Sequence, residues 1–307
     1  MIEARGLTKR YGDKLAVDGL DFTVHPGVVT GFLGPNGSGK STTMRLILGL
    51  DAPTAGTVTV DGRSYAEHPA PLGDVGALLE ARSIHTGRSA RNHLLALAAT
   101  HGIGARRVDE LIDLVGLGDV AGKRVGGFLL GMGQRLGIAA ALLGDPSTII
   151  LDEPVNGLDP EGVRWVRTLL RDLAAEGRTV FLSSHLMAEM AQTAHHVIVV
   201  GRGRLIADVE TAELLASASS TVVVRSPDAD ALAAALAGPD VSVAPGEQAG
   251  VLHVRGVAPE EVGETARRHG LALYELRVDQ ASLEDVFMAL TSDSVEYRAA
   301  TLDGSPA

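Results

Sequence analysis

The chain has 307 residues, and 45% of them are apolar, so it is long enough for two domains with buried cores. Its formal net charge of −11 argues against binding along a nucleic-acid backbone, because such binding needs clustered Lys and Arg. The lack of cysteine excludes disulfides and thiolate metal sites. Residues 1–5 lack the apolar core of a signal peptide, and no stretch approaches the roughly 18 apolar residues of a membrane span. We therefore expect a cytosolic protein that would depend on another chain for any work inside a membrane.

The first part of the chain is expected to consist of short strands and turns. Turn-forming residues lie at 11–13 and 25–27, and a helix-forming apolar run lies at 43–48. Strands are expected at residues 1–7, 20–24, 28–33, 57–60 and 74–79.

The loop between the strand at 28–33 and that first helix reads GPNGSGKST. It fits the pattern G-x-x-x-x-G-K-[ST] of a phosphate-binding loop, in the strand-to-helix context that gives the pattern weight. Its glycines let consecutive backbone N–H groups point inward, and the following helix directs the positive end of its dipole at the same anion. We assign to nucleotide binding the residues Gly34, Pro35, Asn36, Gly37, Ser38, Gly39, Lys40, Ser41 and Thr42.

Two side chains of this loop have specific expected roles. Lys40 would reach the β- and γ-phosphates, and the Ser41 hydroxyl would bind Mg²⁺. The alternative is a Gly-rich turn with a surface lysine. It is disfavoured because lysine is scarce in this chain, which has it at positions 9, 14, 40 and 123.

A mostly helical block is expected from about residue 84 to 145, with helical spacing at 91–100 and 108–115. An Ala- and Leu-rich helix at 134–143 is ended by Gly144-Asp145-Pro146. Apolar strands then alternate with helices, at residues 148–151, 179–182 and 197–200. This order predicts an α/β fold with a largely parallel sheet that is covered on both faces.

Two carboxylates, Asp152 and Glu153, follow the strand at 148–151, where a parallel sheet presents ligands at its C-terminal edge. Asp152 is expected to bind Mg²⁺ directly or through water. Glu153 is expected to orient and deprotonate an attacking water, a contribution of about 10²–10⁴-fold to rate. The alternative is that the acidic pair caps a helix. This alternative is disfavoured because the pair follows a phosphate loop in the same chain.

A second domain is expected at 218–291, after a first domain at 1–217. Its order is the β-α-β-β-α-β of ferredoxin-like domains. The segments are 221–225, 229–236, 241–244, 251–255, 260–268 and 271–278. A closing helix at 282–290 begins with Ser282 as N-cap and an acidic first turn. Residues 292–307 lack periodicity and are expected to be disordered.

Taken together, residues 1 to about 215 resemble the ATP-binding cassette (ABC) ATPases, a branch of the P-loop NTPases. Tyr11 stands where that family stacks an aromatic ring on adenine. His185 resembles the family's switch histidine, which contacts the γ-phosphate. Asp159 ends the run Asn156-Gly157-Leu158-Asp159, which resembles the loop that crosses to a partner subunit. The place of the family signature L-S-G-G-Q is taken by Leu130, Gly131, Met132, Gly133 and Gln134.

The chain departs from the family pattern at two places. Gly131 and Met132 stand where the signature has Ser and Gly, so a hydroxyl donor to the partner's γ-phosphate is missing, although backbone N–H groups still suit an anion. Glu80 stands where the family has the Gln that senses Mg²⁺ and the attacking water, and an ionised carboxylate donates no hydrogen bond. Hydrolysis is still expected, because Lys40 and the catalytic acidic pair are present.

Residues 75–80, 130–132 and 282–287 resemble the bacterial drug- and antibiotic-exporting ABC ATPases of the bacitracin and daunorubicin resistance kind. The resemblance implies a homodimer that sandwiches two ATP molecules with Mg²⁺. It implies that ATP hydrolysis drives a separate permease of about six spans, from the inner face of the cell membrane. The helical block would face this permease. The C-terminal domain would be regulatory, or would support dimerisation or permease assembly, or would be an inert appendage.

Two other interpretations stay open at this point. One is a soluble ABC ATPase that acts on ribosomes or DNA; such proteins usually carry two cassettes or a long coiled-coil insertion, and this chain shows one cassette and no sustained heptads. The other is a nucleotide sensor that lost hydrolysis through Gly131 and Glu80. The transported substrate is left open, because specificity would lie in the membrane subunit.

Overall fold

The computed structural model describes residues 1–79, 84–217, 221–239, 241–279 and 283–291. The second of two compact units spans Ala212–Ala289, so the boundary at 217/218 proposed from the sequence lies one short helix after its start. Glu80, Ser282 and the tail 292–307, for which the sequence makes specific predictions, lie outside the described residues. Within the described residues, no helix is both long enough and apolar enough to cross a bilayer.

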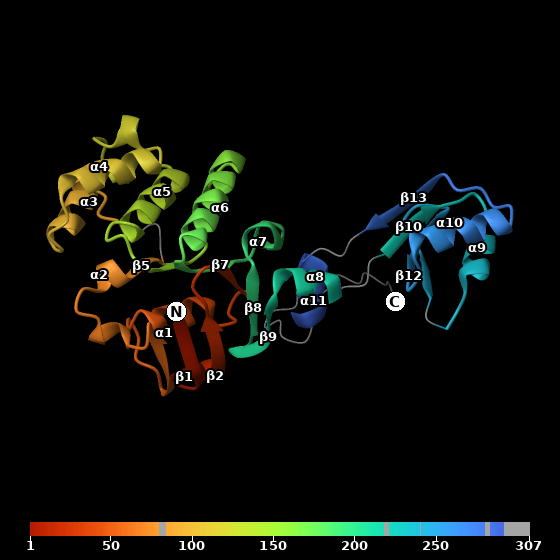
Figure 1. Ribbon diagram of the computed structural model, residues 1–307, viewed down its shortest axis with the longest axis horizontal. Coiled ribbons are helices and arrows are strands. Elements are labelled where there is room, and N and C mark those ends of the chain that lie inside the picture. Colours follow the sequence, from red (N-terminus) through yellow and green to blue (C-terminus); the bar gives the residue numbers. More distant parts are fainter. Residues whose placement is uncertain (80–83, 218–220, 240, 280–282, 292–307) are drawn as a thin grey trace, which may run out of the picture. The chain divides into compact units, whose positions relative to one another are not determined.

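A six-stranded sheet in the order β5-β6-β7-β3-β8-β9 forms the centre of the first unit (Figure 1). The strands are β3 (Val29–Leu33), β5 (Val75–Leu78), β6 (Thr148–Leu151), β7 (Thr179–Ser184), β8 (His196–Gly201) and β9 (Arg204–Glu210). Neighbours from β5 to β8 pair in parallel, and β9 pairs antiparallel with β8. The predicted largely parallel sheet is confirmed. Strand β9 is not among the predicted strands, because it is a half-exposed edge strand without a long apolar run.

A second, antiparallel sheet in the order β2-β1-β4 packs against the first. Its strands are β1 (Ile2–Tyr11), β2 (Lys14–Val24) and β4 (Ala55–Val60). Phe22 of β2 lies with its ring centroid 5.9 Å from Phe32 of β3 and 6.0 Å from Phe181 of β7. The same core contains Met44 and Ile47 of helix α1 (Lys40–Ile47). The helix that follows the phosphate loop is therefore fixed between the two sheets.

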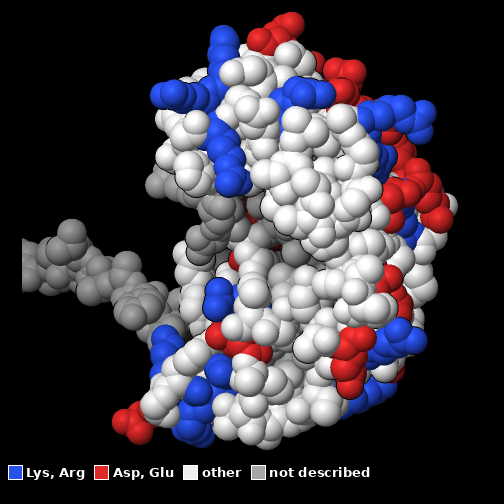
Figure 2. Space-filling view, turned by 90° about the vertical axis from the view of Figure 1, so that its left-hand side faces the viewer, with Lys and Arg blue, Asp and Glu red and all other residues white. Residues whose placement is uncertain are grey.

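The other helices of this unit surround the sheets, and Figure 1 shows α3 and α4 beside α5 as a separate lobe. The α-helices are α2 (Pro71–Asp74), α3 (Ala90–Ala99), α4 (Ala105–Leu114), α5 (Leu130–Ala141), α6 (Pro160–Ala175) and α7 (Met187–Thr193). Short 3₁₀ turns lie at Tyr65–Glu67, Gly118–Val120 and Val125–Gly127. Figure 2 shows a hollow between this upper lobe and a lower one, with Lys and Arg side chains above and below it. The helical block predicted for residues 84–145 corresponds to the lobe.

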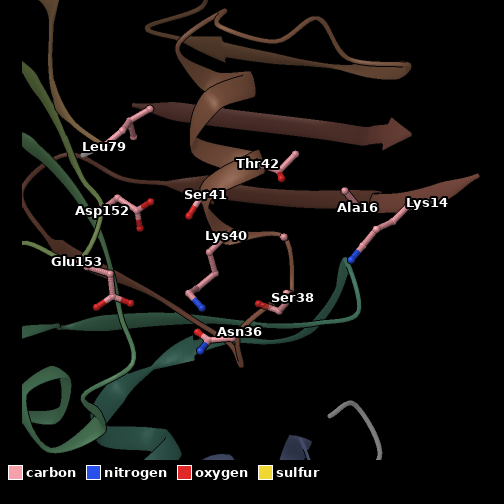
Figure 3. A pocket seen from close by; sticks show the side chains of 12 residues that line it. Lys14, Ala16, Asn36, Ser38, Lys40, Ser41, Thr42, Leu79, Asp152 and Glu153 are labelled. Carbon is pink, nitrogen blue, oxygen red and sulfur yellow. The ribbon is translucent and has the colours of Figure 1, made fainter. Parts of the chain in front are cut away.

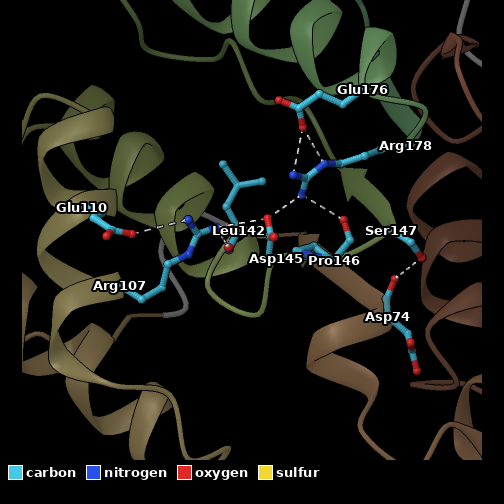
Figure 4. A network of polar contacts seen from close by, with 9 residues as sticks. All are labelled: Asp74, Arg107, Glu110, Leu142, Asp145, Pro146, Ser147, Glu176 and Arg178. Atoms are coloured by element: carbon cyan, nitrogen blue, oxygen red, sulfur yellow. Dashed lines mark hydrogen bonds and ion pairs between the residues drawn. The ribbon is translucent and has the colours of Figure 1, made fainter.

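Polar contacts around Asp145 connect the helical lobe to the parallel sheet (Figure 4). The Asp145 carboxylate accepts hydrogen bonds from Arg107 of α4 at 3.3 Å and from Arg178, just before β7, at 2.8 Å. Arg107 also donates to the Leu142 carbonyl at 3.0 Å. Asp145 is 64% exposed, so each ion pair contributes about 0–1 kcal/mol. These contacts select an orientation of the lobe more than they stabilise the fold.

Close packing of α5 on β5 depends on two glycines. A Cβ atom at Gly76 of β5 would lie 1.9 Å from the Ala141 carbonyl oxygen, and one at Gly137 of α5 would lie 2.6 Å from Leu78 Cδ1. The absence of side chains lets the helix lie directly on the strand. This packing fixes the axis of α5 and hence the position of its first turn.

We expect Gly76→Ala to destabilise the protein by about 1–3 kcal/mol, because the added methyl group would overlap a backbone carbonyl that cannot rotate away. Gly122→Ala is the matched control, because a Cβ atom there meets nothing within 4 Å. Urea unfolding followed by circular dichroism measures both. Equal midpoints for the two variants would contradict the packing argument.

The second unit contains a four-stranded antiparallel sheet in the order β11-β12-β10-β13. Its strands are β10 (Thr221–Arg225), β11 (Ser242–Pro245), β12 (Val251–Arg255) and β13 (Glu275–Asp279). Its helices are α8 (Thr211–Ser217), α9 (Ala229–Leu236), α10 (Pro259–Arg268) and α11 (Leu283–Thr291). Leu232 of α9 and Val262 of α10 share one core with Val222 and Val254 of the sheet. The assignment of this unit to the ferredoxin-like fold stays a prediction.

One strand prediction in this unit is wrong at its start. Residues 271–274 were expected to be strand, but β13 begins at Glu275. Leu271 donates its backbone N–H to the Ala266 carbonyl at 2.9 Å, and Leu271 and Leu273 pack against the core from the loop. The alternating apolar residues therefore come from loop packing, not from a pleated strand.

Candidate nucleotide-binding site

The phosphate loop joins β3 to α1 at the C-terminal edge of the parallel sheet (Figure 3). Gly37 and Gly39 have φ angles of 82° and 101°, a region that favours glycine. A Cβ atom at Gly34 would lie 2.4 Å from Ser38 Oγ, and one at Gly39 would lie 2.4 Å from the Ala16 carbonyl oxygen. The backbone of the loop therefore requires all three glycines that the sequence analysis selects.

A cavity of about 360 Å³ brings the loop and the acidic pair together. It is lined by Lys14, Ala16, Asn36, Gly37, Ser38, Gly39, Lys40, Ser41, Thr42, Leu79, Asp152 and Glu153. Lys14 and Ala16 come from the start of β2, and Leu79 follows β5. None of these three was predicted as a site residue, although Lys14 is one of only four lysines in the sequence. The two halves of the predicted site, which lie far apart in the sequence, thus face one space.

Donor groups inside the cavity suit a phosphate anion. The Lys40 ammonium is buried and donates to the carbonyl oxygens of Gly34 at 2.6 Å and Pro35 at 3.3 Å. Burial lowers the pKa of Lys40, and the charges of Glu153 and Asp152 act in the opposite direction. The Ser38 hydroxyl is buried and has no hydrogen-bond partner among the described residues. A buried hydroxyl without a partner is costly, so a bound phosphate oxygen would satisfy it.

The oxygen groups required for a magnesium ion are also present. Figure 3 shows the Ser41 hydroxyl and the Asp152 carboxylate facing each other across the cavity. Hydroxyl and carboxylate oxygens, together with substrate phosphates, are the ligands that Mg²⁺ takes in nucleotide sites. The donor set of the cavity therefore fits Mg²⁺ with a nucleoside triphosphate.

The acidic pair is held by residues at and just after the end of β7. Ser183 donates its hydroxyl proton to the Asp152 carboxylate and accepts the Glu153 N–H at 3.0 Å. His185 Nδ1 lies 2.8 Å from Glu153 Oε2. Glu153 has a φ of 51°, a left-handed conformation that costs a side-chain-bearing residue roughly 1–2 kcal/mol. Such strain is typical of functional positions, which agrees with the role predicted for Glu153.

Tyr11 lies at the end of β1 and does not line this cavity. Its ring is 45% exposed, and the Lys9 ammonium lies 4.9 Å from the ring centroid. The Tyr11 hydroxyl donates to Asp51 at 2.8 Å, and partial burial together with this carboxylate raises the pKa of Tyr11. The structure therefore orients the ring, and its stacking on adenine stays a prediction.

The signature residues and Asp159 lie outside the cavity. Residues 130–134 form the start of α5, and its N-cap, Leu129, provides no side-chain cap. A Cβ atom at Gly131 would lie 2.7 Å from the Gly157 carbonyl oxygen, so a serine there would need the neighbouring loop to shift. Gln134 is buried and donates to the Glu153 carbonyl oxygen at 2.9 Å. Asp159 is the N-cap of α6 and accepts the Gly162 N–H at 2.8 Å.

The comparison with known proteins covers both units. The family described as "ABC transporter" matches residues 17–156, and a domain of unknown function matches residues 220–284. The bacitracin transport ATP-binding protein BcrA of Bacillus licheniformis is 42% identical over 212 residues, which are 68% of this chain and 69% of the relative. The daunorubicin/doxorubicin resistance ATP-binding protein DrrA of Streptomyces peucetius is 34% identical over 97% of this chain and 94% of its own length. The chain belongs to the ATP-binding proteins of ABC transporters. This confirms the resemblance that the motifs indicated.

Solved structures agree with this assignment. An ATP-binding subunit of an ABC transporter matches with a TM-score of 0.64 and 25% identity, over 70% of this chain and 91% of that one. A dimeric cassette in a post-hydrolysis state with ADP and phosphate matches with a TM-score of 0.63 and 23% identity, over 69% of this chain and 99% of that one. The predicted ABC ATPase fold is confirmed, and the chain belongs to a family of ATP-hydrolysing proteins.

We expect Lys40→Met to weaken ATP binding about 10- to 100-fold, the effect of losing a charge-assisted contact of about 1.5–3 kcal/mol. In the unmodified protein, ATP affinity should fall with rising pH as Lys40 loses its proton. Because burial lowers the pKa of Lys40, this fall should begin at a lower pH than an exposed lysine would give.

Calorimetric titration with ATP across the alkaline pH range measures both effects. Lys123→Met, at an exposed lysine of the helical lobe, is the control. A pH-dependent fall of the same size in Lys40→Met would show that another group is responsible.

Proposed function

We propose that this chain is the ATP-hydrolysing subunit of an ABC exporter. It would dimerise around two ATP molecules and drive a separate membrane permease in drug or antibiotic efflux. The observation that carries the proposal is the single cavity in which the phosphate loop faces Asp152 and Glu153. Membership of the ABC family supports the coupling of this chemistry to transport.

The residues of the cavity have distinct roles in this proposal. Backbone N–H groups of the loop, the Ser38 hydroxyl and the Lys40 ammonium bind the phosphates. Ser41 and Asp152 hold Mg²⁺, which, when bound, neutralises phosphate charge. Glu153 takes a proton from the water that attacks the γ-phosphorus, and the products are ADP and inorganic phosphate. His185 Nδ1 lies 2.8 Å from Glu153 Oε2 and holds that carboxylate. Contact of its ring with the γ-phosphate is part of the proposal and follows from the family resemblance.

The homodimer would complete each site with the first turn of α5 from the partner subunit. The positive end of its dipole and the backbone N–H groups of Leu130 and Gly131 would bind the γ-phosphate of an ATP held by the opposite phosphate loop, since the N–H groups of Met132 and Gly133 already donate to the Leu129 carbonyl oxygen at 3.0 and 3.1 Å. Gly131, Met132 and Gly133 would approach that ATP through their backbone, and Asp159 would follow from the neighbouring loop. Packing of Gly131 against Gly157 supplies a reason for the missing serine that does not require lost activity. The missing serine is therefore no argument for the nucleotide-sensor interpretation, and the presence of Lys40, Asp152 and Glu153 in one cavity supports hydrolysis.

The names of the relatives support the transport part of the proposal. BcrA of Bacillus licheniformis is named for bacitracin transport, and SrtF of Streptococcus pyogenes, 33% identical over 91% of its length, for lantibiotic transport. DrrA of Streptomyces peucetius is named for daunorubicin and doxorubicin resistance. We propose a permease of about six spans as the partner, and the inner face of the cell membrane as the place of work.

We expect Glu153→Gln to lower ATP turnover by at least 100-fold while ATP binding is retained, because the amide cannot accept the proton. Phosphate release by the purified dimer measures turnover, and nucleotide titration measures binding. Glu110→Gln, on the outer face of α4, is the control. Unchanged turnover in Glu153→Gln would reject the assigned role.

We expect a polytopic membrane protein to copurify with this chain in stoichiometric amount after gentle solubilisation of native membranes. Capture through a tag and mass spectrometry identify it. Recovery from the soluble fraction with ribosomal or DNA-bound proteins would contradict the exporter proposal and leave the ATPase site intact.

A further inference from the structure

Glu153 is held in its left-handed backbone conformation by side chains from different elements. Its φ of 51° lies in a region that residues with a Cβ avoid. Ser183 of β7 accepts its N–H at 3.0 Å, and Gln134 of α5 donates to its carbonyl oxygen at 2.9 Å. Both peptide groups of Glu153 are thus anchored. An unfavourable conformation persists when its surroundings determine it in this way.

Gln134 is the anchor that belongs to the signature segment. The side chain is 3% exposed and donates inward to its own chain, not outward to the surface where a partner would bind. The same Glu153 carbonyl oxygen also accepts the Asn156 N–H at 3.2 Å, so it stays paired if the amide of Gln134 is removed. Gln134 is therefore the side chain that ties this turn to α5, and its contribution is to position the Glu153 peptide.

The first turn of α5 and the loop after Glu153 are in close contact at Gly131 and Gly157. A Cβ atom at Gly131 would lie 2.7 Å from the Gly157 carbonyl oxygen, and one at Gly157 would lie 2.4 Å from Leu130 Cδ2. Segments in such close contact at two points transmit displacements, because neither can move toward the other. A shift of the start of α5 therefore reaches Glu153 through the loop and through Gln134.

We propose that Gln134 is a positioning residue for Glu153 of its own subunit and that it links the two ATP sites of the dimer. The inference rests on the proposed function, in which the first turn of α5 contacts the ATP held by the partner subunit. That ATP fixes the position of α5, and Gln134 of α5 in turn fixes the orientation of the Glu153 peptide group. Glu153 then acts on the ATP of its own phosphate loop. Occupancy of one site thereby controls hydrolysis at the other.

Heterodimers with two different tags separate this role from direct contact with ATP. One copy carries Glu153→Gln, so that hydrolysis occurs only with the Glu153 of the other copy. Gln134→Leu is then placed either in the copy with the intact Glu153 or in the copy with Glu153→Gln. We expect turnover to fall at least tenfold in the first arrangement and to stay within twofold in the second.

Each other result has a defined meaning. A loss confined to the second arrangement would make Gln134 a ligand of the partner's ATP and overturn the proposal. Equal losses in both would indicate a general packing defect and overturn it as well. Gln134→Glu, which keeps the shape but lacks the donor at neutral pH, should reproduce the loss in the first arrangement; full activity there would also overturn the proposal.

If the parent heterodimer does not hydrolyse ATP, the proposed function fails, and the role of Gln134 must be tested without nucleotide. Hydrogen exchange provides that test. Hydrogen exchange in the full-length protein should be faster at residues 151–158 in Gln134→Leu than in the unmodified chain. Exchange at residues 34–42 should be unchanged. Unaltered exchange at 151–158 would show that Gln134 does not hold Glu153.

Discussion

The burial of α1 between the two sheets is the constraint on which the site depends. Met44 and Ile47 share a core with Phe22, Phe32 and Phe181, so the helix cannot move without opening both sheets. The phosphate loop is therefore anchored by β3 at one end and by α1 at the other. Burial of Lys40 follows from this anchoring, and its ammonium is directed at the cavity in advance of any ligand. A binding group that is already in place avoids the entropy cost of ordering it.

Local sequence was sufficient to predict which loop and which carboxylates line the candidate site. The phosphate loop and Asp152-Glu153 are each contiguous and follow strands whose apolar runs are unambiguous. The parallel sheet brings their ends to the same edge, so the fold class alone implies that they meet. The cavity confirms this juxtaposition for Lys40, Ser41 and the two carboxylates.

The contacts that sequence reasoning missed depend on packing between distant segments. No local pattern shows that Lys14 and Leu79 reach the cavity or that Gln134 turns inward to Glu153. In the sequence alone, Gly131 indicates only that a hydroxyl donor is missing. The structure adds that a side chain at this position would overlap the Gly157 carbonyl oxygen. The prediction of strand for residues 271–274 was wrong for the same reason. Leu271 and Leu273 pack on the core from a loop, and this packing produces the same alternation of apolar residues as a strand. Tertiary contact, more than local preference, decided each of these positions.

The hydrogen bond between Tyr11 and Asp51 has a consequence for nucleotide choice. The Tyr11 hydroxyl already donates its proton to the Asp51 carboxylate. A nucleotide base could therefore contact the face of the Tyr11 ring but would receive no hydrogen bond from its hydroxyl. Stacking on an aromatic face tolerates every base, because each has a π surface. If Tyr11 stacks on the base as the sequence predicts, it would supply affinity without reading the edge of the base. Discrimination against guanine or pyrimidine triphosphates would then be weak, and the abundance of ATP in the cell would decide which nucleotide is used.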